Sequence, residues 1–114
     1  MRILCDTNII LDVLLDREGF ADTAANVLQL CETGIIEGFT TASCMTDIFY
    51  LVHEQLHDNE RSYQAIEQLL TVVRIADVTS GHIEEALSHR ASDLEDCLAA
   101  VCAKSIHCDC IVTR

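Results

Sequence analysis

"RILCDTNIILDVLLDR", residues 2–17, begins with a short apolar run, continues through an acidic residue and then shows a helical pattern. Residues 2–5 suit a buried strand, and residues 8–17 place isoleucine, valine and leucine at helical spacing. A strand that passes directly into a helix is the repeating unit of α/β folds with a parallel sheet. Asp6 follows the strand at once, and ligands of such folds collect at the carboxyl ends of the strands. The stretch therefore predicts a fold class and the edge at which to look for chemistry.

The same alternation continues along the rest of the sequence. Apolar runs predict further strands at residues 35–40, 71–77 and 110–113. Helical patterns occupy the segments between them, namely 20–34, 42–56, 60–70, 79–91 and 92–105. No internal repeat, low-complexity segment or linker interrupts this order. We therefore expect residues 1–114 to form a single α/β domain.

Composition narrows the cellular setting. Half of the 114 residues are hydrophobic, only 4% are aromatic, and there is no proline, which is typical of a regular, helix-rich domain. No apolar run approaches the roughly 20 residues that cross a bilayer. The start, "MRILCDTN", meets an acid too early for a signal peptide. Seven cysteines without an export signal favour free thiols in a reducing cytoplasm.

The formal net charge of −12 limits the possible partners. A surface this acidic repels nucleic acid, because unaided binding of phosphate groups needs a basic footprint. Two routes to a phosphate-handling function remain. Divalent cations can bridge carboxylates to phosphate, or a basic partner can supply the positive charge.

Acidic residues in three separate segments are candidates for such a cation site. Asp6 lies at the first strand end, and Asp47 lies near the start of an otherwise apolar helix. Asp93 and Asp96 lie three residues apart and share a helix face, where they repel each other unless a cation or water intervenes. Mg²⁺ prefers carboxylate oxygens and retains several waters, so a set of aspartates without histidine suits it.

Each of these acids also has an ordinary structural explanation. Asp6 or Thr7 could cap the helix that follows the first strand, and Asp47 could complement a helix dipole. Ser92 and Glu95 stand in capping-box register at the start of the last helix. Spacing alone does not decide between capping and metal binding.

Taken together, "DTNIILDVLLDR", "TDIFYLV" and "DLEDCLAAVCAKS…DCIVTR" resemble the PIN-domain ribonucleases, including VapC-type toxins of bacterial toxin–antitoxin pairs. The resemblance implies a three-layer α/β/α fold with a central, mainly parallel sheet. It also implies a nuclease that uses Mg²⁺ or Mn²⁺ to cleave single-stranded RNA. Matched motif by motif, it assigns catalytic and metal-binding roles to Asp6, Asp47 and Asp96, an accessory metal role to Asp93, and supporting roles to Thr7 and Asn8, which would orient the first carboxylate and its water.

The resemblance carries further expectations. It implies an antitoxin partner, an RNA substrate and a homodimer formed through helices, with no membrane association. The family pattern continues beyond "IVTR" with a further acid and a final strand, whereas this sequence stops at Arg114. We therefore expect a truncated C-terminal strand region and three matching carboxylates in place of four. The alternative function is a catalytically silent PIN-like module that binds an antitoxin or RNA.

Two predictions follow for the geometry. Asp6, Asp47 and Asp96 should lie within the few ångströms that a shared cation or bridging water requires. Asp58 and Asp109 should lie elsewhere.

Other metal or cofactor motifs are weaker. His107, Cys108 and Cys110 have ligand-like spacing without a second pair, so buried thiols are favoured over zinc. His53 and His57 share a helix face but lack an HExxH pattern. No glycine-rich phosphate loop is present, so a nucleotide cofactor is not predicted.

Overall fold

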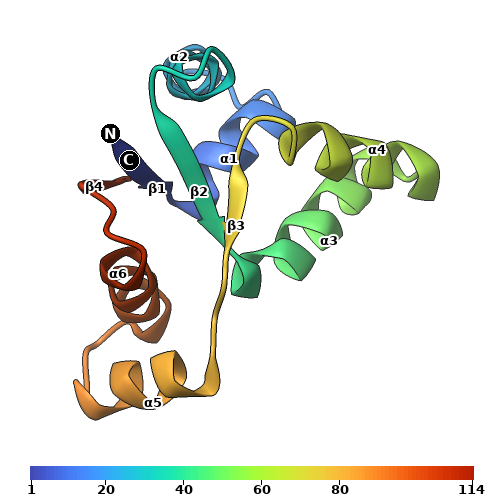
Figure 1. Cartoon of the computed structure of the whole chain (residues 1–114). Helices are drawn as coiled ribbons and strands as arrows, with labels where there is room; N and C mark the ends of the chain where they lie inside the picture. The colour runs from blue at the N-terminus through green and yellow to red at the C-terminus, as the bar shows by residue number, and fades with distance from the viewer.

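Four parallel strands form the sheet of the computed structural model, which describes all residues 1–114 (Figure 1). The strands are β1 (Arg2–Cys5), β2 (Glu37–Thr41), β3 (Arg74–Ala76) and β4 (Cys110–Val112), in the order β3-β2-β1-β4. The chain moves outward from β1 to β3 on one side and returns to β4 on the other. The carboxyl end of β1 is therefore the point at which the strand order reverses, where α/β folds bind their ligands.

Six α-helices cover the two faces of this sheet. They are α1 (Thr7–Leu14), α2 (Ala21–Glu32), α3 (Met45–Leu56), α4 (Asn59–Leu69), α5 (Ser80–Ser88) and α6 (Leu94–Ser105), with a 3₁₀ turn at Ala42–Cys44. Helices α1 to α4 lie on one side, while α5 and α6 lie on the other (Figure 1). This arrangement confirms the predicted α/β/α architecture with a parallel sheet.

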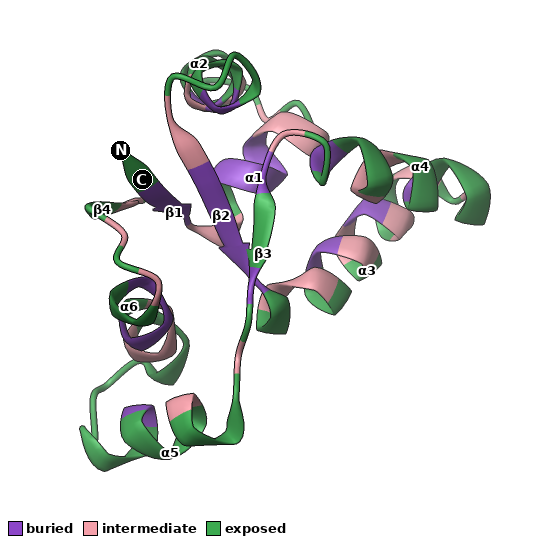
Figure 2. Ribbon diagram, in the orientation of Figure 1, coloured by how far each residue is buried: buried purple, intermediate pink, exposed green.

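The central strand β1 divides the core between the two faces. Ile3 and Cys5 pack with buried residues of α1 to α4, whereas Leu4 packs with Phe39, Ala76 and Ala103 on the α6 side. The first cluster is the larger. Helix α5 is mostly exposed, as Figure 2 shows, and Ala86 is its one buried residue. The α1–α4 side therefore contributes most of the apolar burial that holds β1 in place.

Several element boundaries differ by a few residues from those that the sequence predicts. The strand expected at 71–77 shrinks to Arg74–Ala76, because the amide groups of Val72 and Val73 donate back to the carbonyl of Leu69 and extend the end of α4 as a turn. The predicted helix stop at Gly34 is close to the observed end of α2, and Gly34 adopts a positive φ of 81°. No helix is both long and apolar enough to span a membrane.

Candidate functional site

A cavity of about 930 Å³ opens at the carboxyl end of β1. Its walls come from β1, the end of β2, the starts of α1, α3 and α6, and the segment that follows β4. This is the edge of the sheet at which the sequence predicted chemistry.

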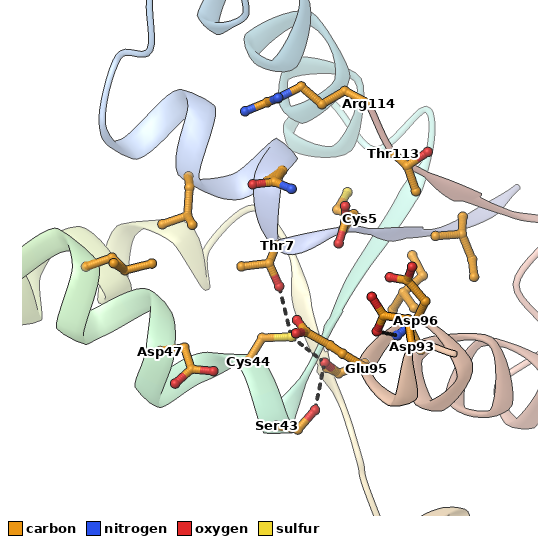
Figure 3. Close-up of a pocket in the computed structure, with 18 of the residues that line it drawn as sticks. Cys5, Thr7, Ser43, Cys44, Asp47, Asp93, Glu95, Asp96, Thr113 and Arg114 are labelled. Carbon is orange, nitrogen blue, oxygen red and sulfur yellow. Dashed lines mark hydrogen bonds between the residues drawn. The ribbon is translucent and has the colours of Figure 1, made fainter. Parts of the chain in front are cut away.

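Five carboxylate side chains line the cavity: Asp6, Asp47, Asp93, Glu95 and Asp96. In Figure 3, Asp47 approaches from α3 on one side, and the three acids of α6 and its cap approach from the other. Segments that are distant in the sequence thus face one space. Asp58 and Asp109 lie outside it, as predicted: Asp58 accepts a hydrogen bond from the Arg61 amide at 2.9 Å, and Asp109 accepts one from the Arg2 amide at 2.8 Å.

The carboxylates surround the cavity without forming a direct metal cage. No group of three acidic, histidine or cysteine side chains is close enough to hold one ion directly. Asp6, Asp47 and Asp96 do line one cavity, and their convergence on a shared cation or bridging water stays a prediction. Carboxylates that share a site repel each other when no cation neutralises them, and this cavity is wide enough to keep them apart.

Capping does not account for Asp6. It occupies the N-cap position of α1, yet its side chain makes no cap hydrogen bond. Its backbone amide instead donates to the carbonyl of Val112 at 2.9 Å, which fixes the start of α1 against β4. Asp47 lies in the first turn of α3 and is exposed, where the helix dipole favours a negative charge.

Asp93 is the residue that caps α6. Its Oδ1 accepts a hydrogen bond from the Asp96 amide at 3.0 Å. The predicted capping box of Ser92 with Glu95 is wrong, because the helix starts one residue later than that register requires. Glu95 lines the cavity instead.

Thr7 and Asn8 line the cavity, but their side chains bond elsewhere than to Asp6. The Thr7 hydroxyl donates to the Cys44 thiol at 3.1 Å, and this thiol also lies 2.8 Å from Thr41 Oγ1. Asn8 Oδ1 accepts from Arg17 at 3.3 Å. Thr7 thus joins α1 to the 3₁₀ turn that follows β2 (Figure 3), and its hydroxyl does not orient the first carboxylate as expected.

The sequence reasoning missed a buried ion cluster beside the cavity. The Asp12 side chain is only 1% exposed and binds two guanidinium groups. Arg114 donates to both carboxylate oxygens, at 2.7 and 3.1 Å, and Arg17 Nη1 lies 3.4 Å from Oδ1. The hydrogen bonds from Arg114 hold the pKa of Asp12 below its usual range although burial acts to raise it. A single acid within the apolar run "IILDVLL" was the available signal, because a buried charge needs a partner.

The remaining sequence motifs form no site. His53 stacks on Phe49 with ring centroids 6.2 Å apart, and His57 ends α3 in the left-handed conformation. His107, Cys108 and Cys110 belong to no metal-binding group.

Comparisons with known proteins agree with this architecture. A family model described as "PIN domain" matches residues 2–114. Among solved structures, the chain resembles Mycobacterium tuberculosis VapC20, which is described as a "Sarcin-Ricin loop cleaving toxin". The TM-score is 0.73 at 16% sequence identity, over 96% of this chain and 86% of VapC20. None of the curated proteins matches the chain.

Proposed function

We propose a function from one premise: the chain belongs to the PIN domain family. The protein is an endoribonuclease that cleaves phosphodiester bonds of single-stranded RNA, and it is the toxin of a toxin–antitoxin pair. One observation carries the proposal. Acids from three separate segments, Asp6, Asp47 and Asp96, line one cavity at the reversal point of a parallel sheet. The fold that it shares with an RNA-cleaving toxin supports the choice of substrate.

The residues around the cavity fit a hard divalent cation, Mg²⁺ or Mn²⁺. Their donors are carboxylate, hydroxyl and amide oxygens, and Mg²⁺ is commonly held by one or two carboxylates with several waters. The absence of a three-acid cage agrees with such a water-rich shell. Asp6, Asp47 and Asp96 would surround the ion and bind it in part through its water molecules, with Asp93 in an accessory role. When bound, it would activate water and stabilise negative charge on the phosphate.

The chain's own residues have separable tasks in this proposal. The hydrogen bond from the Asp6 amide to the carbonyl of Val112 fixes the backbone of Asp6 at the end of β1, and this positions its carboxylate. Asp96 lies in the first turn of α6, whose start Asp93 caps. Thr7 binds Cys44 and holds α1 near the turn that leads into α3 and Asp47.

The metal requirement can be tested on a panel of single-stranded RNA oligonucleotides with Mg²⁺, Mn²⁺ or EDTA. We expect cleavage with either ion and none with EDTA. Asp96→Asn should reduce the cleavage rate at least about 100-fold, because it removes a charge that holds the ion. Asp58→Asn is the matched control, since asparagine caps a helix as well as aspartate does. Equal cleavage by Asp96→Asn and the unmodified protein would refute the site assignment.

A second candidate function is a catalytically silent PIN-like module that binds RNA or an antitoxin. The wide placement of the carboxylates favours it, because no three of them reach one ion. The same RNA panel decides: binding without cleavage under every metal condition supports the silent module.

The proposal includes two protein partners, an antitoxin and a second copy of this chain. Large apolar side chains remain exposed on α2, α3 and α4, including Leu30, Tyr50 and Tyr63. Sedimentation at micromolar concentration should show a dimer. Monomer alone at that concentration would contradict the homodimer.

A further inference from the structure

We propose that Arg17 and Arg114 form a phosphate-binding edge of the cavity and that the buried carboxylate of Asp12 positions both guanidinium groups. The inference rests on the proposed function, because it names how the same cavity holds the RNA backbone. It adds three residues to those that the sequence motifs singled out.

The first support is electrostatic. Five acids line the cavity, and an RNA phosphate that enters it needs positive charge in addition to any metal ion. The sequence has seven lysines and arginines, and only Arg17 and Arg114 line the cavity. Arg2 and Arg74 form salt bridges with Glu37 at the beginning of β2, whereas the cavity lies at the other end of this strand. The cavity's own basic side chains are therefore these two arginines.

The second support is the geometry of the cluster. One carboxylate, Asp12, holds two guanidinium groups, so the cluster has an excess of one positive charge. Both arginine side chains remain 32% exposed although Asp12 is buried. Each guanidinium has five N–H donors. Arg114 uses Nε and Nη2 on Asp12, which leaves donors for an oxyanion.

The third support is preorganisation. The Arg114 guanidinium lies over the Phe20 ring, 4.0 Å from its centroid, which restricts its plane. Arg17 is held by Asp12 and also by Asn8, a residue of the cavity wall. An arginine that is already fixed loses less conformational entropy on binding phosphate than a free surface arginine does. Hydrogen bonding to Asp12, chiefly, and also the negative charge of Asp6 raise the pKa of Arg114, so this guanidinium keeps its positive charge.

The test measures the dissociation constant of a fluorescent single-stranded RNA by anisotropy in MgCl₂, with every variant made in the Asp96→Asn protein, so that the cation neutralises the remaining cavity acids and cleavage does not contribute. Arg17→Gln and Arg114→Gln should each weaken binding about 3–10-fold, and each should reduce the slope of log K against log salt by about one. The matched control is Arg61→Gln on α4, which makes the same charge change outside the cavity. It should leave binding within about twofold.

Asp12→Asn separates positioning from charge. The substitution makes the protein less acidic, so net charge alone predicts tighter RNA binding. If Asp12 positions the arginines, binding should weaken about threefold or more, as measured at a temperature where circular dichroism shows the variant folded. Tighter or unchanged binding by folded Asp12→Asn would refute the positioning role.

If Asp12→Asn does not fold, the two arginine variants still test whether this edge of the cavity binds phosphate. Unchanged binding and salt slope in both Arg17→Gln and Arg114→Gln would overturn the phosphate edge. It would also be overturned if Arg61→Gln weakened binding equally. Arginine-dependent binding, with no cleavage by the unmodified protein in Mg²⁺ or Mn²⁺, would instead refute only the nuclease function.

Discussion

Asp12 is a buried carboxylate in an otherwise apolar stretch of α1, and its charge persists because two guanidinium groups reach it. Hydrogen bonds from Arg114 lower its pKa in the folded protein relative to the usual value of about 4 in an unfolded chain. The ionised form therefore stabilises the fold above about pH 4. That contribution is lost as the pH falls through the lower, folded-state pKa.

Removing the charge of Asp12 should thus flatten the acid limb of the stability curve. Between pH 5 and pH 3, the Tm of the unmodified protein should fall more steeply than that of Asp12→Asn, because asparagine does not titrate. At pH 7 the variant should melt at a lower temperature. Thermal melts followed by circular dichroism across this range provide the measurement. Glu18→Gln, at an exposed position, should keep the original slope, and the prediction fails if Asp12→Asn keeps it too.

The thiols should differ widely in reactivity. Burial, followed by the proximity of Cys31, raises the pKa of Cys5 to about 12, and burial raises the pKa of Cys31 as well. Thiolate is the reactive form, so both should resist alkylation at pH 8. Cys110 is exposed. Iodoacetamide labelling with peptide mass spectrometry should modify Cys110 first and Cys5 only after denaturation. Equal labelling of Cys5 and Cys110 in the native protein would contradict this.

The sequence predicted the positions of the cavity acids better than their bonding. Asp6 was placed correctly because it directly follows a predicted strand, and that position depends on only a few neighbouring residues. The role of Asp12 was not predicted because it depends on a bond to Arg114, 102 positions away. The alternation of strands and helices along the sequence does not reveal such a contact. The partners of Thr7 and Asn8 were likewise set by tertiary contacts with Cys44 and Arg17.

At the scale of elements, Gly38 allows α2 to approach β2 closely. A Cβ atom built there would lie 2.5 Å from Cys31 Sγ and 3.2 Å from Val73 Cγ1. Gly38→Ala should therefore lower the free energy of unfolding by about 1–3 kcal/mol, as overpacked cores do. Urea denaturation measures this change.

Gly81 in α5 provides the matched control for that substitution. The nearest atom to a Cβ there is Thr79 Oγ1 at 3.7 Å, an ordinary contact, so Gly81→Ala should be neutral or stabilising. The double variant Gly38→Ala with Cys31→Ala should recover part of the loss, because the closest clashing atom is gone. If Gly38→Ala is as stable as Gly81→Ala, the close approach does not constrain the fold.

Element types were predictable, whereas their ends were less so. All four observed strands overlap the apolar runs that predicted them. Strands β1 and β2 are buried along most of their length, as strands covered on both faces should be, whereas β3 and β4 are not. The start of α6 was misplaced because Ser92 and Asp93 are both good caps by residue type. The path of the chain made the choice: Asp93 has the extended conformation, with φ −123° and ψ 107°, and bonds the Asp96 amide.

At the scale of the whole molecule, the net charge of −12 and the acidic cavity predict that divalent ions stabilise the fold by binding to it. An ion present at ten times its dissociation constant adds about 1.4 kcal/mol, or about 5 °C in Tm for a domain of this size. MgCl₂ or MnCl₂ should therefore raise the Tm more than NaCl of equal ionic strength. Asp96→Asn should reduce the difference, and equal effects of the three salts would contradict a specific site.

The pairing of β4 with β1 also affects the order in which the strands of the sheet form during folding. The register joins Ile3 to Cys110, and the Asp6 amide bonds Val112, so these contacts close a loop of more than 100 residues. Such closure is entropically costly and slow compared with local contacts. During synthesis, residues 1–76 can pair β1, β2 and β3 before β4 emerges. The carboxylate cavity then receives its Arg114 edge last, so a partly made chain carries the acids without that edge. Pulsed hydrogen exchange during refolding should show the Asp6 amide protected later than the amides shared by β1 and β2.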